Sequence, residues 1–248
     1  MPHDRLARSL NARLTSRSAA QALAVALDAP ELDEIALVSS FGAEAAVLLH
    51  LVAVSAPDLP VLFIDTGKHF TETLVYGQEL VERLALRNVR YISGDVAAIK
   101  ARDPYGALHI ANPDACCALR KSDPLQAALG AMPRLSALIT GRKRYQGGPR
   151  SALEVFEADK ATGLIKINPL AHWQPKDLRD YMEENRLPKH PLLAKGYLSI
   201  GCAPCTSPVA QGEDSRAGRW RGNDKVECGI HFINGQAMRR PMTQKETT

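Results

Sequence analysis

Short apolar runs that end in polar, glycine-bearing turns recur through the first 141 residues of the chain. Four of these runs have the length of buried strands, at residues 34–40, 59–67, 89–93 and 135–141. Leucine and alanine recur at three- and four-residue steps over 4–27, which predicts a helix there. Strong helix formers predict a helix at 43–53, and Asp123 as an N-cap before Pro124 predicts one at 124–130. Further helices are predicted at 175–187 and in a segment with Phe70, Leu74, Val81 and Leu84 on one face. Strands that alternate with helices predict an α/β fold with a doubly wound, mainly parallel sheet.

Three of the predicted strands run into polar turns, "SSFGAE" (39–44), "DTGK" (65–68) and "TGRKRYQGGPR" (140–150). Because the carboxyl ends of parallel strands share one edge of a sheet, we expect these turns to lie together, where ligands bind in such folds. Hydroxyls, glycines and free N–H groups at a helix start favour an anion, and arginines favour sulfate or phosphate. The chain lacks the G-x-G-x-x-G and Walker patterns, which argues against a dinucleotide fold or an ordinary P-loop.

Composition sets limits on the class of protein. The chain has 248 residues, 45% hydrophobic and 23% charged, with a formal net charge of +4. The charge is small and evenly spread, so it suits a small anion better than a nucleic acid. No apolar run approaches the ~20 residues of a membrane span, and no secretory signal is visible at the amino terminus. We expect a cytoplasmic protein, and a homo-oligomer is compatible with these features. One α/β domain is expected over 1–205, and the polar, aperiodic segment 206–248 is expected to be a mobile tail.

Four of the five cysteines form two close pairs, Cys116–Cys117 in "CCALRK" and Cys202–Cys205 in "CAPC". Soft thiolate ligands suit zinc or an iron–sulfur cluster. Side chains of neighbouring helical residues leave the backbone about 100° apart, which makes one shared zinc ion awkward and favours the separate corners of a [4Fe–4S] cubane. Structural zinc and buried, unliganded cysteines remain the alternatives.

The fifth cysteine, Cys228, stands in "KVECGIHF" with His231 three residues later. A thiol near histidine, lysine and arginine has a depressed pKa and can act as a nucleophile. Arg216 and Arg219 precede it and add two cations. The alternative is a surface cysteine without a role.

These motifs, in this order, resemble those of the APS and PAPS reductase family (reductases of adenosine 5′-phosphosulfate and of 3′-phosphoadenosine 5′-phosphosulfate). The resemblance covers roughly residues 34 to 232 and also includes "NPLAHW", "GEDSRAGRW" and "ECGIHF". The paired cysteines with CxxC resemble the cluster-bearing branch, which favours APS over PAPS as the substrate. The loop at Gly147, Gly148 and Pro149 departs from the Ser-Pro-Thr that is more usual in the family, and Lys143 stands where arginine is more common.

The resemblance implies an adenine nucleotide α-hydrolase-like sheet and assigns roles to particular residues. Cys228 would be the nucleophile with His231 beside it, and Lys121 would lie near both the cluster and the substrate. A [4Fe–4S] cluster would be held by Cys116, Cys117, Cys202 and Cys205. The substrate would be held by Ser39, Ser40, Phe41, Gly42, Glu44, Asp65, Thr66, Gly67, Arg144, Arg150, Arg216 and Arg219.

The implied activity is reduction of APS to sulfite and AMP through a Cys228 S-sulfonate, with thioredoxin as a separate donor of electrons in sulfate assimilation. Three other functions remain open. The first is PAPS reduction, and the second is an adenylating or tRNA-thiolating enzyme on the same type of sheet. The third is a cluster-bearing redox sensor that binds nucleic acid, which would leave "ECGIHF" unexplained.

Overall fold

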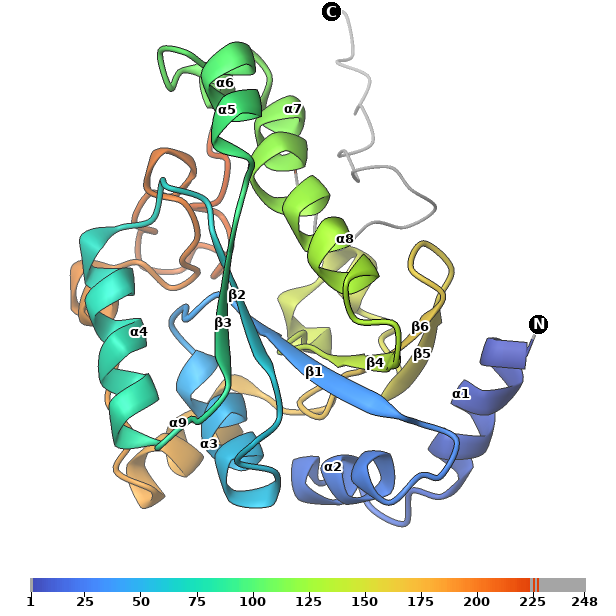
Figure 1. Cartoon of the computed structure of the whole chain (residues 1–248). Helices are drawn as coiled ribbons and strands as arrows, with labels where there is room; N and C mark the ends of the chain where they lie inside the picture. Colours follow the sequence, from blue (N-terminus) through green and yellow to red (C-terminus); the bar gives the residue numbers. More distant parts are fainter. Residues whose placement is uncertain (1, 224, 226, 228–248) are drawn as a thin grey trace, which may run out of the picture.

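The computed structural model describes residues 2–223, 225 and 227. In this part of the chain a six-stranded sheet has the order β3–β2–β1–β4–β6–β5, and only β5 runs antiparallel to its neighbour (Figure 1). The strands are β1 (Glu34–Ser39), β2 (Val61–Asp65), β3 (Val89–Ser93), β4 (Leu135–Ile139), β5 (Phe156–Asp159) and β6 (Leu164–Ile167). The predicted α/β fold with a mainly parallel sheet is confirmed.

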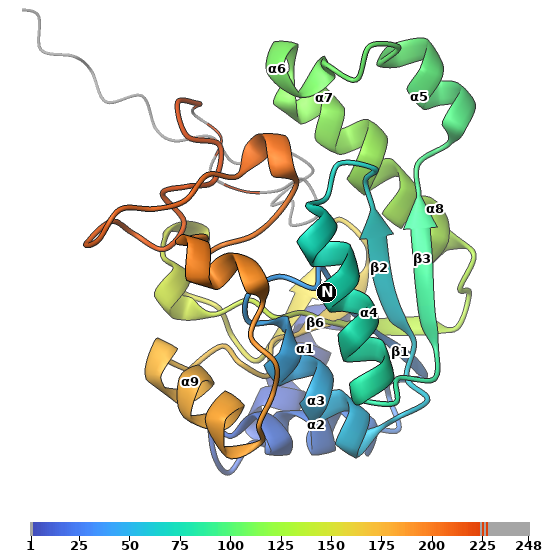
Figure 2. The same ribbon diagram turned by 90° about the vertical axis from the view of Figure 1, so that its left-hand side faces the viewer.

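Alternate residues of the central strands bury the two faces of the sheet in separate cores. On one face, Leu37, Phe63 and Ile139 pack with helices α2 (Ala19–Leu27), α3 (Ala45–Ser55), α4 (Thr71–Arg83) and α9 (Pro175–Glu184). On the other face, Ala36 and Leu62 pack against α8 (Asp123–Gly130). Figures 1 and 2 show α4 and α8 on opposite sides of β2 and β3. Burial on both faces explains why these strands are continuous apolar runs.

The amino-terminal region differs from the single helical stretch predicted over 4–27. Two helices form, α1 (Pro2–Ala12) and α2, and the residues between them are turns. Ser18 stops a continuous helix because its extended backbone starts α2 and its hydroxyl accepts a hydrogen bond from the Gln21 N–H at 3.2 Å. The prediction is therefore wrong for the linking residues.

The sequence pattern did not predict β5 and β6, which form an antiparallel hairpin at one edge of the sheet. It also did not predict α5 (Val96–Arg102) and α6 (Leu108–Ala111), which precede the cysteine-bearing helix. Each of these elements has four to seven residues, too few to show a clear hydrophobic period.

The adjacent cysteines end a short helix, α7 (Pro113–Cys117), which continues through a π-helical turn at Ala118–Ser122 into α8. Asp123, the predicted N-cap of the helix at 124–130, lies inside this continuous helical stretch and has helical dihedral angles itself. The Asp123 N–H donates to the Ala118 carbonyl, five residues back. Such π turns are rare and are frequent at functional sites.

Residues 206–223, in the segment predicted to be a mobile tail, pack against the body of the molecule. The Val209 N–H donates to the Gly196 carbonyl at 3.0 Å, and the Trp220 N–H donates to the Cys205 carbonyl at 3.0 Å. Trp220 is 6% exposed. The described part of this segment is therefore folded structure, which the polar and aperiodic composition did not indicate. None of the helices in the described part of the chain has the length and apolar character needed to cross a bilayer.

Candidate functional site

A cavity of about 210 Å³ opens where β1 and β4 lie side by side. The chain leaves β1 toward β2 and β3 on one side, and returns to β4 and β6 on the other. The boundary between β1 and β4 is therefore the topological switch point, where open α/β sheets bind ligands. Ser39 at the end of β1 and Thr140 after β4 both line the cavity, as expected for turns at the carboxyl ends of strands.

The turn after β1 forms one wall of the cavity. Ser39, Ser40, Gly42 and Glu44 line it, and the Ser39 hydroxyl accepts from the Phe41 N–H at 3.2 Å. Phe41 itself does not line the cavity. Its φ is 46° and its ring packs at 5.1 Å from that of Phe63 in the core. A buried, left-handed phenylalanine is a strained conformation that the surrounding packing must hold, and it makes the chain turn sharply between β1 and α3.

The basic loop after β4 is tied to this turn through Glu44. The Lys143 ammonium lies 2.7 Å from the Glu44 carboxylate, and the Tyr145 hydroxyl donates to the same carboxylate. Lys143 is 3% exposed, and burial lowers its pKa, although the charge of Glu44 opposes that effect. The two polar turns that the sequence placed at one sheet edge are thus joined by a partly buried ion pair.

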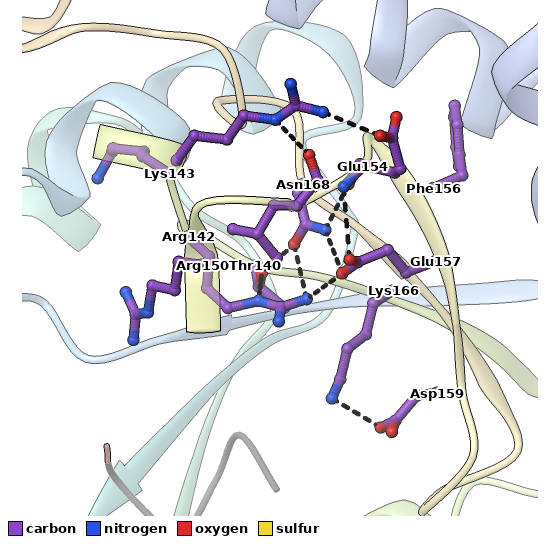
Figure 3. Close-up of polar contacts among 12 residues, drawn as sticks. Thr140, Arg142, Lys143, Arg150, Glu154, Phe156, Glu157, Asp159, Lys166 and Asn168 are labelled. Carbon is purple, nitrogen blue, oxygen red and sulfur yellow. Dashed lines mark hydrogen bonds and ion pairs between the residues drawn. The ribbon is translucent and has the colours of Figure 1, made fainter. Parts of the chain in front are cut away.

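Arg142 also lines the cavity, and three polar contacts fix its guanidinium (Figure 3). It donates to the Thr140 hydroxyl at 3.1 Å, to the Asn168 side-chain oxygen at 3.0 Å and to Glu157 at 2.9 Å. Asn168 follows β6, is fully buried, and donates to Glu157 at 3.0 Å. A network that spans the ends of β4, β5 and β6 therefore holds one cation at the cavity wall.

Arg144, which the sequence assigned to substrate binding, lies outside the cavity. It pairs with Glu154 at 3.0 Å, and both side chains are substantially exposed. The backbone at Lys143 is extended, so the side chains of Lys143 and Arg144 point to opposite sides, and Lys143 rather than Arg144 faces the cavity.

The segment after Cys205 closes the cavity with two further arginines, Arg216 and Arg219. The Arg219 guanidinium lies 4.4 Å from the centre of the Trp220 ring. It also lies against the backbone of Gly201, where an added Cβ would come within 2.4 Å of a guanidinium nitrogen. Gly201 is therefore what allows Arg219 to approach the wall of the cavity.

A carboxylate from the same segment enters the cavity. Arg150 donates from Nε and Nη2 to Glu227 at 2.7 and 2.8 Å, and Arg216 lies 3.3 Å from the same carboxylate. The side chains of Arg150 and Glu227 are 10% and 6% exposed. Nearby, Lys225 lies 2.6 Å from Asp114 on α7 and is 4% exposed.

The four paired cysteines line a second, small cavity next to the first. Cys116, Cys117 and Cys202 are buried and Cys205 is partly buried. Burial raises the pKa of the Cys116 and Cys205 thiols, while Arg120 near Cys116 and Lys121 near Cys205 act in the opposite direction. Among the described residues, no group of three or more His, Cys, Asp or Glu side chains is arranged to bind one metal ion.

The "DTGK" turn lies at the cysteines rather than at the larger cavity. The Thr66 hydroxyl is 3.3 Å from the sulfur of Cys202, and the Ala203 N–H donates to the Lys68 carbonyl at 2.8 Å. Thr66 lines the cysteine cavity, whereas Asp65 and Gly67 line neither. This turn therefore positions the CxxC loop.

Two cations from the π turn meet the cysteine cavity. Arg120 donates to Asp103 at 2.8 Å and to the Thr66 carbonyl at 3.1 Å, and both members of the ion pair are buried. Burial would raise the pKa of Asp103, but hydrogen bonds from Leu108 and Arg120 outweigh it and lower that pKa. Lys121 lines both cavities, so it is a cation that the larger cavity and the cysteine cavity share.

The predicted site residues thus divide into clear groups. The larger cavity brings together Ser39, Ser40, Gly42, Glu44, Lys121, Arg150, Arg216 and Arg219. The cysteine cavity gathers the four predicted ligands and Thr66. Phe41, Asp65, Gly67 and Arg144 line neither cavity, and Cys228 and His231 lie outside the described residues.

Sequence reasoning missed Glu227 and Asn168, although both stand in motifs already singled out, "ECGIHF" and "NPLAHW". Arg142 and Lys143 stand in the basic loop "TGRKRYQGGPR" but were not among the predicted site residues. The signal for Arg142 was its position after β4, at the same sheet edge as Asn168 after β6.

A cationic crevice at the switch point of a mainly parallel sheet places the chain in the class of adenine nucleotide α-hydrolase-like α/β proteins. Yeast FAD synthetase in complex with FAD has this fold in common with the chain, with a TM-score of 0.56 and 18% identity over 82% of this chain and 73% of that one. The chain belongs to the phosphoadenosine phosphosulfate reductase family. The family model described as "Phosphoadenosine phosphosulfate reductase domain" matches residues 34–208.

Individual relatives agree with this assignment. The chain is 56% identical over 200 residues to the adenosine 5′-phosphosulfate reductase of Mesorhizobium japonicum, covering 81% of this chain and 77% of the relative. It is 40% identical over 202 residues to the phosphoadenosine 5′-phosphosulfate reductase of Gloeobacter violaceus, covering 80% and 83%. The crystal structure of the Candida auris PAPS reductase in complex with phosphate is similar with a TM-score of 0.67 and 28% identity, covering 82% of this chain and 96% of that one.

Proposed function

We propose that the protein reduces adenosine 5′-phosphosulfate to sulfite and AMP in sulfate assimilation, with thioredoxin as the electron donor. One observation carries the proposal: a cavity lined by arginines and lysines adjoins a cavity lined by four cysteines, and Lys121 belongs to both. The cations suit a phosphosulfate, and the turn between β1 and α3 suits a nucleotide at a switch point. APS is favoured over PAPS because the cysteine pairs resemble the cluster-bearing branch, and because the Mesorhizobium japonicum relative is an APS reductase.

The proposed reaction begins when the Cys228 thiolate attacks the sulfate sulfur of APS. The new S–S bond forms as the bond from sulfur to the phosphate oxygen breaks, and AMP leaves with that electron pair. Arg216 and Arg219 would stabilise the charge that develops on the leaving phosphate. His231, three residues after Cys228, would stay near the thiol. The product is Cys228 S-sulfonate.

The second half of the reaction needs a dithiol. One thioredoxin thiolate attacks the Cys228 sulfur, sulfite leaves, and a mixed disulfide remains. The second thioredoxin thiol resolves it, so the donor loses two electrons and Cys228 returns as a thiol. A reducing cytoplasmic compartment would supply that donor.

The cysteine cavity fits a [4Fe–4S] cluster in its donor set. Cys116, Cys117, Cys202 and Cys205 would hold the cluster, because four thiols from two segments face one buried space. When bound, the cluster would supply a concentrated field beside Lys121. Arg120 and Lys225 would keep this region cationic, and Thr66 would hold the CxxC loop.

The test is incubation of the purified protein with APS and reduced thioredoxin, without ATP. AMP and sulfite should appear together, and APS alone should leave a sulfonate on Cys228 that mass spectrometry detects. Cys228→Ser should release no sulfite while it keeps its nucleotide affinity. PAPS at matched concentration should react more slowly. A wild-type protein that acquires no sulfonate from APS would end the proposal.

A further inference from the structure

Glu227 occupies the position that an anionic ligand of the cavity would take. Its carboxylate accepts two hydrogen bonds from the planar guanidinium of Arg150, at 2.7 and 2.8 Å, and lies 3.3 Å from Arg216. This bidentate arrangement is the one that arginine uses for phosphate, sulfate and carboxylate alike. Glu227, Arg150 and Arg216 all line the same cavity.

Two other cations of the cavity pair with carboxylates on the body of the protein. Lys143 pairs with Glu44, and Arg142 pairs with Glu157. Those carboxylates belong to β5 and to the turn that joins β1 to α3. Glu227 is different because it lies outside any helix or strand, near the end of the described part of the segment after Cys205.

We infer that Glu227 is an internal competitor for the anion site, and that it sets the affinity of the cavity for the phosphate end of a nucleotide. This inference rests on the proposed function. Arg150 and Arg216 cannot pair fully with the Glu227 carboxylate and a dianionic phosphate at once, because two anions at one guanidinium repel each other. A nucleotide phosphate therefore displaces Glu227, and the energy of the ion pair is subtracted from the energy of binding.

Lys225 keeps the displaced segment close to the site. Its ammonium lies 2.6 Å from Asp114 on α7 and 5.7 Å from the centre of the Trp220 ring, two contacts that do not involve the arginines. A carboxylate tethered two residues away has a high effective concentration at Arg150, which is what makes an internal competitor effective. Glu227 thus lowers the affinity for a nucleotide phosphate without contacting the nucleotide.

The experiment measures AMP binding by isothermal titration calorimetry, without turnover. Glu227→Gln removes the charge at nearly constant size, and AMP should bind about tenfold more tightly to this variant, equivalent to about 1.4 kcal/mol. Glu227→Asp keeps the charge but shortens the side chain, so its affinity should fall between those of the wild type and Glu227→Gln. In an Arg150→Gln background the effect of Glu227→Gln should shrink to less than about twofold, because the competing pair is already broken.

Glu213→Gln is the matched control. Glu213 lies in the same segment and pairs with Arg221 at 2.8 Å on the surface, so this variant removes a carboxylate without touching the cavity. AMP affinity should stay within about twofold of the wild type. An equal gain in Glu213→Gln would show that loosening the segment, and not competition at Arg150, raises the affinity.

The outcomes separate the inference from the proposed function. If the wild type binds AMP and Glu227→Gln binds it equally or more weakly, Glu227 is no competitor and only the inference falls. If neither protein binds AMP, the cavity is not a nucleotide site, and the proposed function falls with the inference. If the wild type binds AMP but acquires no sulfonate from APS, the proposed reaction is wrong, and the inference that Glu227 competes with the phosphate is unaffected.

Discussion

The ion pair between Arg120 and Asp103 gives a sharp test of how the cysteine region is held together. The pair is 2.8 Å long, and its side chains are 10% and 2% exposed. Asp103→Asn would remove the negative charge and leave the guanidinium buried beside the cysteines. Breaking one partner of a buried pair costs about 3–5 kcal/mol, because the remaining charge loses its compensation. Asparagine can still accept the hydrogen bond from the Leu108 N–H, so we expect about 3 kcal/mol.

The matched control is Asp33→Asn, the same chemical change in a pair with Arg134 that is 2.6 Å long. Those side chains are 52% and 76% exposed, so their attraction is screened by solvent, and the loss of stability should be much smaller than in Asp103→Asn.

Equilibrium urea titration under anaerobic conditions, followed by the fluorescence of Trp173 and Trp220, measures both variants. With a slope of about 3 kcal/mol per molar urea, Asp103→Asn should lower the midpoint by about 1 M, and Asp33→Asn should lower it by much less. Equal shifts in the two variants would refute the argument that burial makes the first pair important.

Two further predictions concern other parts of the molecule. Gly201→Ala should weaken AMP binding about tenfold with little change in the urea midpoint, because the new Cβ displaces the flexible Arg219 guanidinium rather than the backbone. The control is Gly130→Ala, whose new Cβ meets nothing within 4 Å and which should leave AMP affinity unchanged. Unchanged affinity in Gly201→Ala would contradict this role. Burial lowers the pKa of His190 to about 4, so the unfolded chain binds the extra proton below pH 6.5 and stability should fall by about 1.4 kcal/mol per pH unit from pH 6.5 toward 4. Replacement of His190 by glutamine should flatten that slope in urea titrations at each pH, and an identical slope in both proteins would show that His190 is not the cause.

The central strands could be predicted because they are buried on both faces, and burial leaves an unbroken apolar run such as "VLFID". The β5–β6 hairpin could not, because each strand has four residues and carries charge. Its Lys166 and Asp159 pair at 2.9 Å and are both buried. Such a pair becomes compatible with a buried strand only when both partners are brought together, and the sequence pattern does not show that.

The location of the site followed from topology, but the direction of its side chains did not. Any parallel sheet gathers the turns after its strands at one edge, so the turns at Ser39 and Thr140 had to meet. Whether Lys143 or Arg144 faces the cavity depends on the local backbone, and the three adjacent basic residues look alike in the sequence. The "DTGK" turn also belongs to that edge, yet Thr66 contacts Cys202 instead of the cavity. Turns that follow neighbouring strands can therefore line two different cavities.

The charge of the chain shows most clearly what folding adds. The formal net charge is only +4, and along the sequence the basic residues look evenly spread. Among the residues that line the larger cavity, six are cations (Lys121, Arg142, Lys143, Arg150, Arg216 and Arg219) and two are carboxylates (Glu44 and Glu227). The cavity lining thus carries an excess of four positive charges, equal to that of the whole chain, so the remainder of the protein is balanced. A field concentrated in one crevice attracts an anion there and not to the surface at large. Displacing Glu227 would raise that excess further at the moment when a phosphate arrives.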